Sequence, residues 1–152
     1  MNEWLVRPFV EYGVSSALKQ MYPLKALGPD RMSPLFFQHF WSTSGAVVTK
    51  TVLDFLNFGI FPPYFNETHI TLVPKIKEPN KITDYRPISL CNVVYKIASK
   101  AIANRLKKFL PSIISDTQSA FVHGRLITDN VLVAFETMHH ISQKKGGKVG
   151  EM

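Results

Sequence analysis

Lys75 and Arg86 are the residues whose types and positions best suit ligand chemistry. Lys75 begins a polar stretch, 75–83, that separates two segments of strand-like sequence, and Arg86 lies near the start of the second segment. A short hairpin there would bring both cations to the same ligand. Arginine offers a planar fork that matches phosphate oxygens, and lysine adds a point charge. The spacing is compatible with a phosphate-binding pair, but two solvated charges beside a turn are the more common meaning of such a pattern.

A second group of cations lies on the helix expected after the hairpin. Lys96, Lys100 and Lys107 fall on the face opposite its apolar stripe. Such a row suits the tracking of a nucleic-acid backbone, although a solvated helix face is its usual meaning. Arg105 lies inside the apolar stripe instead, so we expect its guanidinium group to be paired or to extend to solvent.

The segment QSAFVHGR, from Gln118 to Arg125, is a third candidate for nucleic-acid binding. Gly124 would let the backbone approach a ligand closely, and Arg125 could meet a backbone phosphate. Phe121 could stack on a base, but a core position is the safer interpretation of a single phenylalanine in a chain this apolar.

No group of acids or histidines in the sequence predicts a catalytic or metal site. His139 and His140 are adjacent and would point to different sides of a helix. None of the aspartates stands beside another acid in an arrangement that would hold two magnesium ions. The five aspartates are Asp30, Asp54, Asp84, Asp116 and Asp129.

The first part of the chain reads as three helices. Apolar spacing predicts a helix over 14–22, ended by Pro23, and a helix over 45–58 that stops at Gly59. Between them, Ser33-Pro34 is typical of a cap with proline at the first helical position, before a helix over 35–41. The turn Gly28-Pro29-Asp30 is expected to be structural.

The second part reads as a hairpin followed by two helices. Strands are predicted over 68–73 and 85–90, with Pro87 at an edge or bulge. Asn92 or Ser89 can cap the next helix, which Pro111 should end. A last helix over 129–143 is expected to bury Val131, Ala134, Phe135 and Met138. The fold class is therefore α+β, mostly helical with one β-hairpin.

Composition favours a polyanionic partner. The chain has 152 residues, which suits one domain, and a formal net charge of +7. Its one cysteine, Cys91, rules out an internal disulfide and is expected to be a small buried residue. Because the sequence shows no signal peptide and no apolar run of about 20 residues, nucleic acid is preferred to a membrane as the partner.

Four segments resemble the reverse transcriptase of plant LINE-type (non-LTR) retroelements. They read PFVEYGVSSAL, PLKALGPDRMSPLFFQHFW, THITLVPKIKEPNKITDYRPISLCNVVYKIASKAIANRLK and SAFVHGRLITDNVLVAFETMHH. The resemblance implies a partial reverse transcriptase domain over 1–152, matching the fingers and upper palm of a polymerase. Residues 1–66 would be a helical N-terminal extension, and its part through Trp41 would match a leading segment that helps to hold an RNA template. Residues 67–152 would supply the fingers hairpin, the basic helix and the following segment.

The resemblance also implies roles for the candidate residues. Lys75 and Arg86 would contact the triphosphate of an incoming dNTP, while RNA template and DNA primer would be the other partners. The QSAFVxGR motif would lie near template and nucleotide, and the complete enzyme would use Mg²⁺. No membrane partner is implied, and the location would be nuclear or cytoplasmic. The template-side residues are Gln118, Phe121, Gly124 and Arg125.

Two differences from the family stand out, one that affects the shape of a turn and one that affects activity. Leu27 and Arg31 stand where the family usually has proline and glycine in the turn. The family's metal-binding aspartates would follow Met152, so we expect no catalytic residue in this chain and no polymerisation by it alone. The alternatives are a module that retains nucleic-acid or nucleotide binding, and a retroelement relic whose exposed apolar surface makes it poorly soluble.

Overall fold

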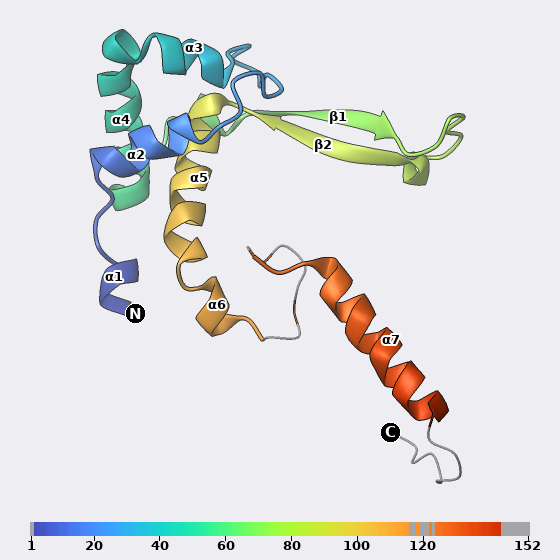
Figure 1. Ribbon diagram of the computed structural model, residues 1–152. Coiled ribbons are helices and arrows are strands. Elements are labelled where there is room, and N and C mark those ends of the chain that lie inside the picture. The colour runs from blue at the N-terminus through green and yellow to red at the C-terminus, as the bar shows by residue number, and fades with distance from the viewer. Residues whose placement is uncertain (1, 116–117, 119–121, 123, 144–152) are drawn as a thin grey trace. The chain divides into compact units, whose positions relative to one another are not determined.

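The computed structural model describes residues 2–115, 118, 122 and 124–143 (Figure 1). These residues form helices and one antiparallel hairpin, as the sequence predicted. The chain divides into two compact units, Met1–Leu106 and Lys107–Met152. The first unit holds the core, the hairpin and most of the candidate residues. The predicted boundary between residues 66 and 67 stays a prediction.

Four helices open the first unit: α1 (Asn2–Leu5), α2 (Glu11–Lys19), α3 (Pro34–His39) and α4 (Trp41–Phe58). Helix α5 (Val93–Lys107) packs with α2, α3 and α4 in one apolar core. Burial of these side chains is the main force that holds the helices together. The core residues are Val14, Ala17, Leu18, Met21, Phe37, Val48, Val52, Val93, Val94, Ile97, Ala98 and Ala101.

The predicted start of α3 and the predicted stop of α4 are confirmed, whereas α2 ends at Lys19, before Pro23. The Ser33 hydroxyl accepts a hydrogen bond from the Phe36 N–H at 3.4 Å, and Pro34 occupies the first helical position. Gly59 ends α4 with a φ of 73°, the left-handed conformation that glycine adopts without strain. Helix α4 begins at Trp41 rather than at residue 45, because the Phe40 carbonyl already accepts from Thr43 and Ser44.

The hairpin consists of β1 (Thr68–Pro74) and β2 (Tyr85–Cys91), paired antiparallel from Thr68 opposite Cys91 to Pro74 opposite Tyr85 (Figure 1). The short helix η1 (Pro63–Asn66) precedes it, and η2 (Ile82–Asp84) lies in its tip. All seven residues of β1 are exposed. The hairpin is thus a two-stranded ribbon that contributes little to the core.

The second unit contains α6 (Leu110–Ile113) and α7 (Ile127–Gln143), and two predictions about this region were wrong. Pro111 does not end α5, which stops at Lys107; it lies in the first turn of α6, where a missing N–H costs nothing. The apolar face of α7 is exposed, since Val131, Phe135 and Met138 keep between 64% and 69% of their surface. Within its unit, the four-residue α6 is too short to cover that face. Ala134 is exposed as well.

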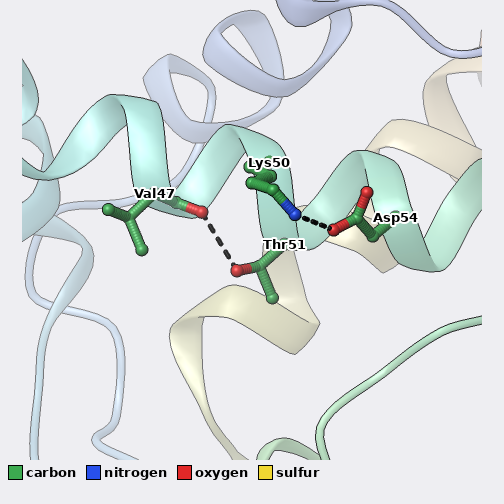
Figure 2. A network of polar contacts seen from close by, with 4 residues as sticks. All are labelled: Val47, Lys50, Thr51 and Asp54. Atoms are coloured by element: carbon green, nitrogen blue, oxygen red, sulfur yellow. Dashed lines mark hydrogen bonds and ion pairs between the residues drawn. The ribbon is translucent and has the colours of Figure 1, made fainter.

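The surface of α4 shows how an ordinary cation is held in this protein (Figure 2). Lys50 Nζ lies 2.7 Å from Asp54 Oδ2, one helical turn away, and the Thr51 hydroxyl donates to the Val47 carbonyl at 3.0 Å. Exposed pairs of this kind stabilise a helix by only about 0.3–0.5 kcal/mol. Lys50 therefore serves below as a reference cation with a local structural partner.

Arg31 occupies a backbone conformation that favours glycine. Its φ is 54°, and its N–H donates to the Gly28 carbonyl at 3.0 Å to close the turn. The left-handed region costs a residue with a Cβ about 1–2 kcal/mol, part of which is offset by the greater freedom of an unfolded glycine. We expect Arg31→Gly to raise the free energy of unfolding by about 0.5–1 kcal/mol in urea denaturation. A lower stability in the variant would contradict the strained turn.

Candidate nucleotide and nucleic-acid interface

The hairpin places Lys75 and Arg86 on the same face. Arg86 lies opposite Val73, and the Lys75 N–H donates to the Asp84 carbonyl at 2.7 Å, so the pairing continues one residue beyond the end of β1. Alternate residues of a strand point to one face, which puts Lys75 on the same side as Val73. Lys75 and Arg86 are then diagonal neighbours, at a Cβ separation of about 7–8 Å that long side chains can span.

The two cations differ in what already holds them. Lys75 Nζ donates to the Thr83 carbonyl at 2.8 Å, which fixes its side chain against the tip. Lys75 forms no ion pair with Asp84 among the described residues, and Asp84 Oδ2 instead accepts from the N–H groups of Asn80 and Lys81, both at 3.0 Å. Arg86 is exposed, and its side chain has no hydrogen bond or ion pair to any residue that the structure describes. The face therefore offers an unpaired guanidinium group beside a fixed ammonium group.

The lysines of α5 are not equivalent. Lys96 Nζ donates to the Ala26 carbonyl at 2.7 Å, and its side chain is half-buried. Burial lowers the pKa of Lys96, and the nearby Lys25 lowers this pKa further, while Cys91 and Asp30 act in the opposite direction. Lys100 is half-buried and Lys107 is exposed. Lys96 thus has a structural contact, whereas Lys100 and Lys107 keep the geometry of a basic stripe.

In the second unit, Arg125 is engaged with its own segment. Its Nη1 donates to the carbonyls of Ser115 and Gln118, the latter at 2.8 Å. Gly124 is exposed and has a φ of 83°, a conformation that favours glycine. Gln118 and Arg125 are therefore brought together by a backbone contact. Phe121 lies outside the described residues, and its predicted place near template stays a prediction.

A polar junction that the sequence only partly predicted anchors the base of the hairpin. Asn92 is 3% exposed and precedes α5, the position expected for a cap. Its Oδ1 accepts from the Asp30 N–H at 3.0 Å, and its Nδ2 donates to the carbonyls of Tyr64 and Phe65 at 3.1 and 3.4 Å. The first N–H of α5, that of Val93, donates to the Asp30 carboxylate at 3.3 Å. Asp30 therefore caps a helix that begins 63 residues further along the chain.

Gly28 lets the turn 28–31 reach this junction. A Cβ built on Gly28 would lie 2.4 Å from the Cys91 carbonyl oxygen and 2.7 Å from the Asn92 nitrogen. Real Cβ atoms do not come this close to backbone, so only glycine fits. The turn Gly28-Pro29-Asp30 has the structural role expected for it, and it fixes the point where β2 meets α5.

Arg105 is paired, as its place in the apolar stripe predicted. Its Nη1 donates to the carbonyls of Leu5 and Arg7 at 3.0 and 2.6 Å, and its guanidinium carbon lies 3.3 Å from the centre of the Phe9 ring. Burial lowers the pKa of Arg105. This contact fastens the N-terminal segment to α5, and it is a structural use of a cation.

The described residues contain no group of three or more His, Cys, Asp or Glu that could hold a metal ion. His139 and His140 on α7 accordingly do not belong to such a group. Among the described helices, none is long and apolar enough to cross a bilayer.

Comparison with known proteins gives two results. The family described as reverse transcriptase (RNA-dependent DNA polymerase) matches residues 73–150, which include the hairpin from Val73, α5 and α7. The chain is also 35% identical over 138 residues to the transposon TX1 uncharacterized 149 kDa protein of Xenopus laevis. That alignment covers 91% of this chain and 11% of the Xenopus protein, so the chain spans about a tenth of this curated relative.

Proposed function

Because the chain belongs to the reverse transcriptase family of retroelements, we propose that it supplies the fingers and upper palm of an RNA-directed DNA polymerase of a LINE-type (non-LTR) element. The plant origin that the four sequence segments suggest is part of this proposal. RNA template, DNA primer and a dNTP are the proposed partners. The observation that carries the proposal is the placement of Lys75 and Arg86 on one face of the hairpin.

The proposed role of this face is to hold the triphosphate of the nucleotide. Arg86 has its guanidinium fork available for a bidentate contact with phosphate oxygens, and the Thr83 carbonyl pre-positions the Lys75 ammonium group beside it. Lys100 and Lys107 would add backbone contacts to nucleic acid along α5. Gln118, Gly124 and Arg125 are proposed to lie near the template.

The described residues are better suited to binding a nucleotide or nucleic acid than to catalysing phosphoryl transfer. Phosphoryl transfer by two metal ions needs a cluster of carboxylates, and the described part of the chain has none. We therefore expect the chain alone not to extend a primer when Mg²⁺ and dNTPs are supplied. A residual nucleic-acid-binding module is the second candidate, favoured by the net charge of +7. A relic without a selected role is the third.

Arg86→Ala should weaken binding of a fluorescently labelled dNTP by at least about tenfold. A hydrogen bond to a charged group contributes about 1.5–3 kcal/mol, and each 1.4 kcal/mol is a factor of ten in Kd. Lys75→Ala should have a smaller effect, because the lysine contributes a point charge whereas the arginine contributes a bidentate fork. Fluorescence anisotropy at two salt concentrations measures both, since phosphate contacts weaken as salt rises.

Lys50→Ala is the matched control. It removes the same unit of charge from a residue whose partner, Asp54, lies on the same helix (Figure 2). Binding should be nearly unchanged in this variant. Equal losses in the Lys50 and Arg86 variants would show that net charge alone attracts the nucleotide, and the assignment of the hairpin would then be wrong.

A further inference from the structure

The outer edge of β1 carries unpaired backbone groups. The hydrogen bond from the Lys75 N–H to the Asp84 carbonyl shows that the odd-numbered residues of β1 face β2. The even-numbered residues therefore direct their backbone groups away from the hairpin. Among the described residues, no group outside the hairpin bonds to the backbone of these positions. They are Thr68, Ile70 and Leu72.

The outer edge of β2 is protected, whereas that of β1 is not. Pro87 lies opposite Leu72, a position whose N–H would point outward, so proline removes a donor from the outer edge without breaking the pairing. Gly28 packs against the Cys91 carbonyl at the other end of β2. Strand β1 has no proline before its last residue, Pro74. The hairpin therefore has one open edge.

The composition of β1 suits pairing with another strand. Its seven residues, THITLVP, include β-branched side chains and no Lys, Arg, Asp or Glu. Proteins usually guard an open edge with charge, proline or a bulge, and β1 has none of these from Thr68 to Val73, because its one proline, Pro74, lies at the end beside the tip. Ile70 and Leu72 keep 69% and 51% of their surface exposed. Pairing would cover both the polar edge and these apolar side chains.

We propose that this edge binds a second copy of the chain, with the two β1 strands antiparallel about a twofold axis at Ile70. Ile70 then faces Ile70 of the second copy, and Thr68 faces Leu72, so each outward N–H and C=O finds a partner. Glu67 becomes the diagonal neighbour of Lys75 of the second copy, an attractive pair at each end. A parallel arrangement in register would instead place Glu67 beside Glu67 and Lys75 beside Lys75 of the second copy, and these like charges would repel. The result is a four-stranded sheet, whose formation can be measured without nucleotide.

Ile70→Lys tests this proposal most directly, because the new lysines would face each other across the axis. Sedimentation velocity over a range of concentrations, at physiological salt to screen the net charge, should show a monomer–dimer equilibrium for the natural chain. The variant should raise the dimer Kd by at least about tenfold. A natural chain that stays monomeric throughout would overturn the proposal.

Ser89→Lys is the matched control, since Ser89 lies opposite Ile70 on the same face but on β2. It should leave the dimer intact. Mixing the Ile70→Lys and Ile70→Glu variants should restore a dimer, because opposite charges then meet at the axis, whereas each variant alone should not. Circular dichroism confirms that the variants fold. If Ser89→Lys breaks the dimer equally, or the mixture fails to recover it, the contact lies elsewhere.

Discussion

Gly28→Ala is expected to lower the free energy of unfolding by at least about 3 kcal/mol, the upper end of what overpacking usually costs. The added Cβ would lie 2.4 Å from the carbonyl oxygen and 2.5 Å from the carbonyl carbon of Cys91. These are backbone atoms at the joint between β2 and α5, so no side chain can rotate away to make room. Domains of this size are stable by about 5–15 kcal/mol in total, so urea denaturation should show a large loss.

The control for this result is Gly13→Ala. Gly13 lies in α2, and a Cβ there would have no heavy atom within 4 Å. Alanine favours the helix, so this variant should gain about 0.5 kcal/mol. Opposite signs in the two glycine variants would identify the close approach at Gly28 as the cause. A neutral Gly28→Ala would mean that the turn does not press against the junction.

The parts of the fold that depend on neighbouring residues could be predicted from the sequence. The cap at Ser33 and the left-handed Gly59 arise from interactions within one helical turn. The hairpin follows from alternation around a polar tip, and that alternation also places Lys75 and Arg86 on one face. In each case a short pattern determines the geometry, because the interacting groups lie a few residues apart in the chain or in paired strands.

The remaining features depend on partners distant in sequence, which periodicity does not identify. An amphipathic pattern in α7 predicts an apolar face but does not show what covers it, and Phe135 is 69% exposed. The contact between Lys96 and the Ala26 carbonyl joins residues 70 positions apart. Likewise, nothing in the sequence around Asn92 points to Asp30. The sequence signal for this junction was Asn92 itself, a polar residue at a cap position directly after a strand.

Asn92→Ala should cost about 3 kcal/mol of unfolding free energy, the second largest effect expected here. The variant leaves the Asp30 N–H and the carbonyls of Tyr64 and Phe65 without the side chain that bonds them. Each such bond contributes about 1 kcal/mol, and a buried group left unpaired costs more. Asn92 also holds Asp30, whose carboxylate accepts from the first N–H of α5. Because the variant removes this support, the base of the hairpin should loosen too. Hydrogen exchange at Val93 measures this directly.

Asn92→Asp separates hydrogen bonding from packing. Aspartate keeps the shape of asparagine but cannot donate to Tyr64 or Phe65 when ionised, and it brings a second carboxylate close to Asp30. It should therefore destabilise the chain at least as much as alanine at neutral pH. Asn80→Ala, at an exposed position in the hairpin tip, should change stability by less than about 0.5 kcal/mol. If Asn92→Asp were as stable as the natural chain, the donated bonds would not hold the junction that anchors the base of the hairpin.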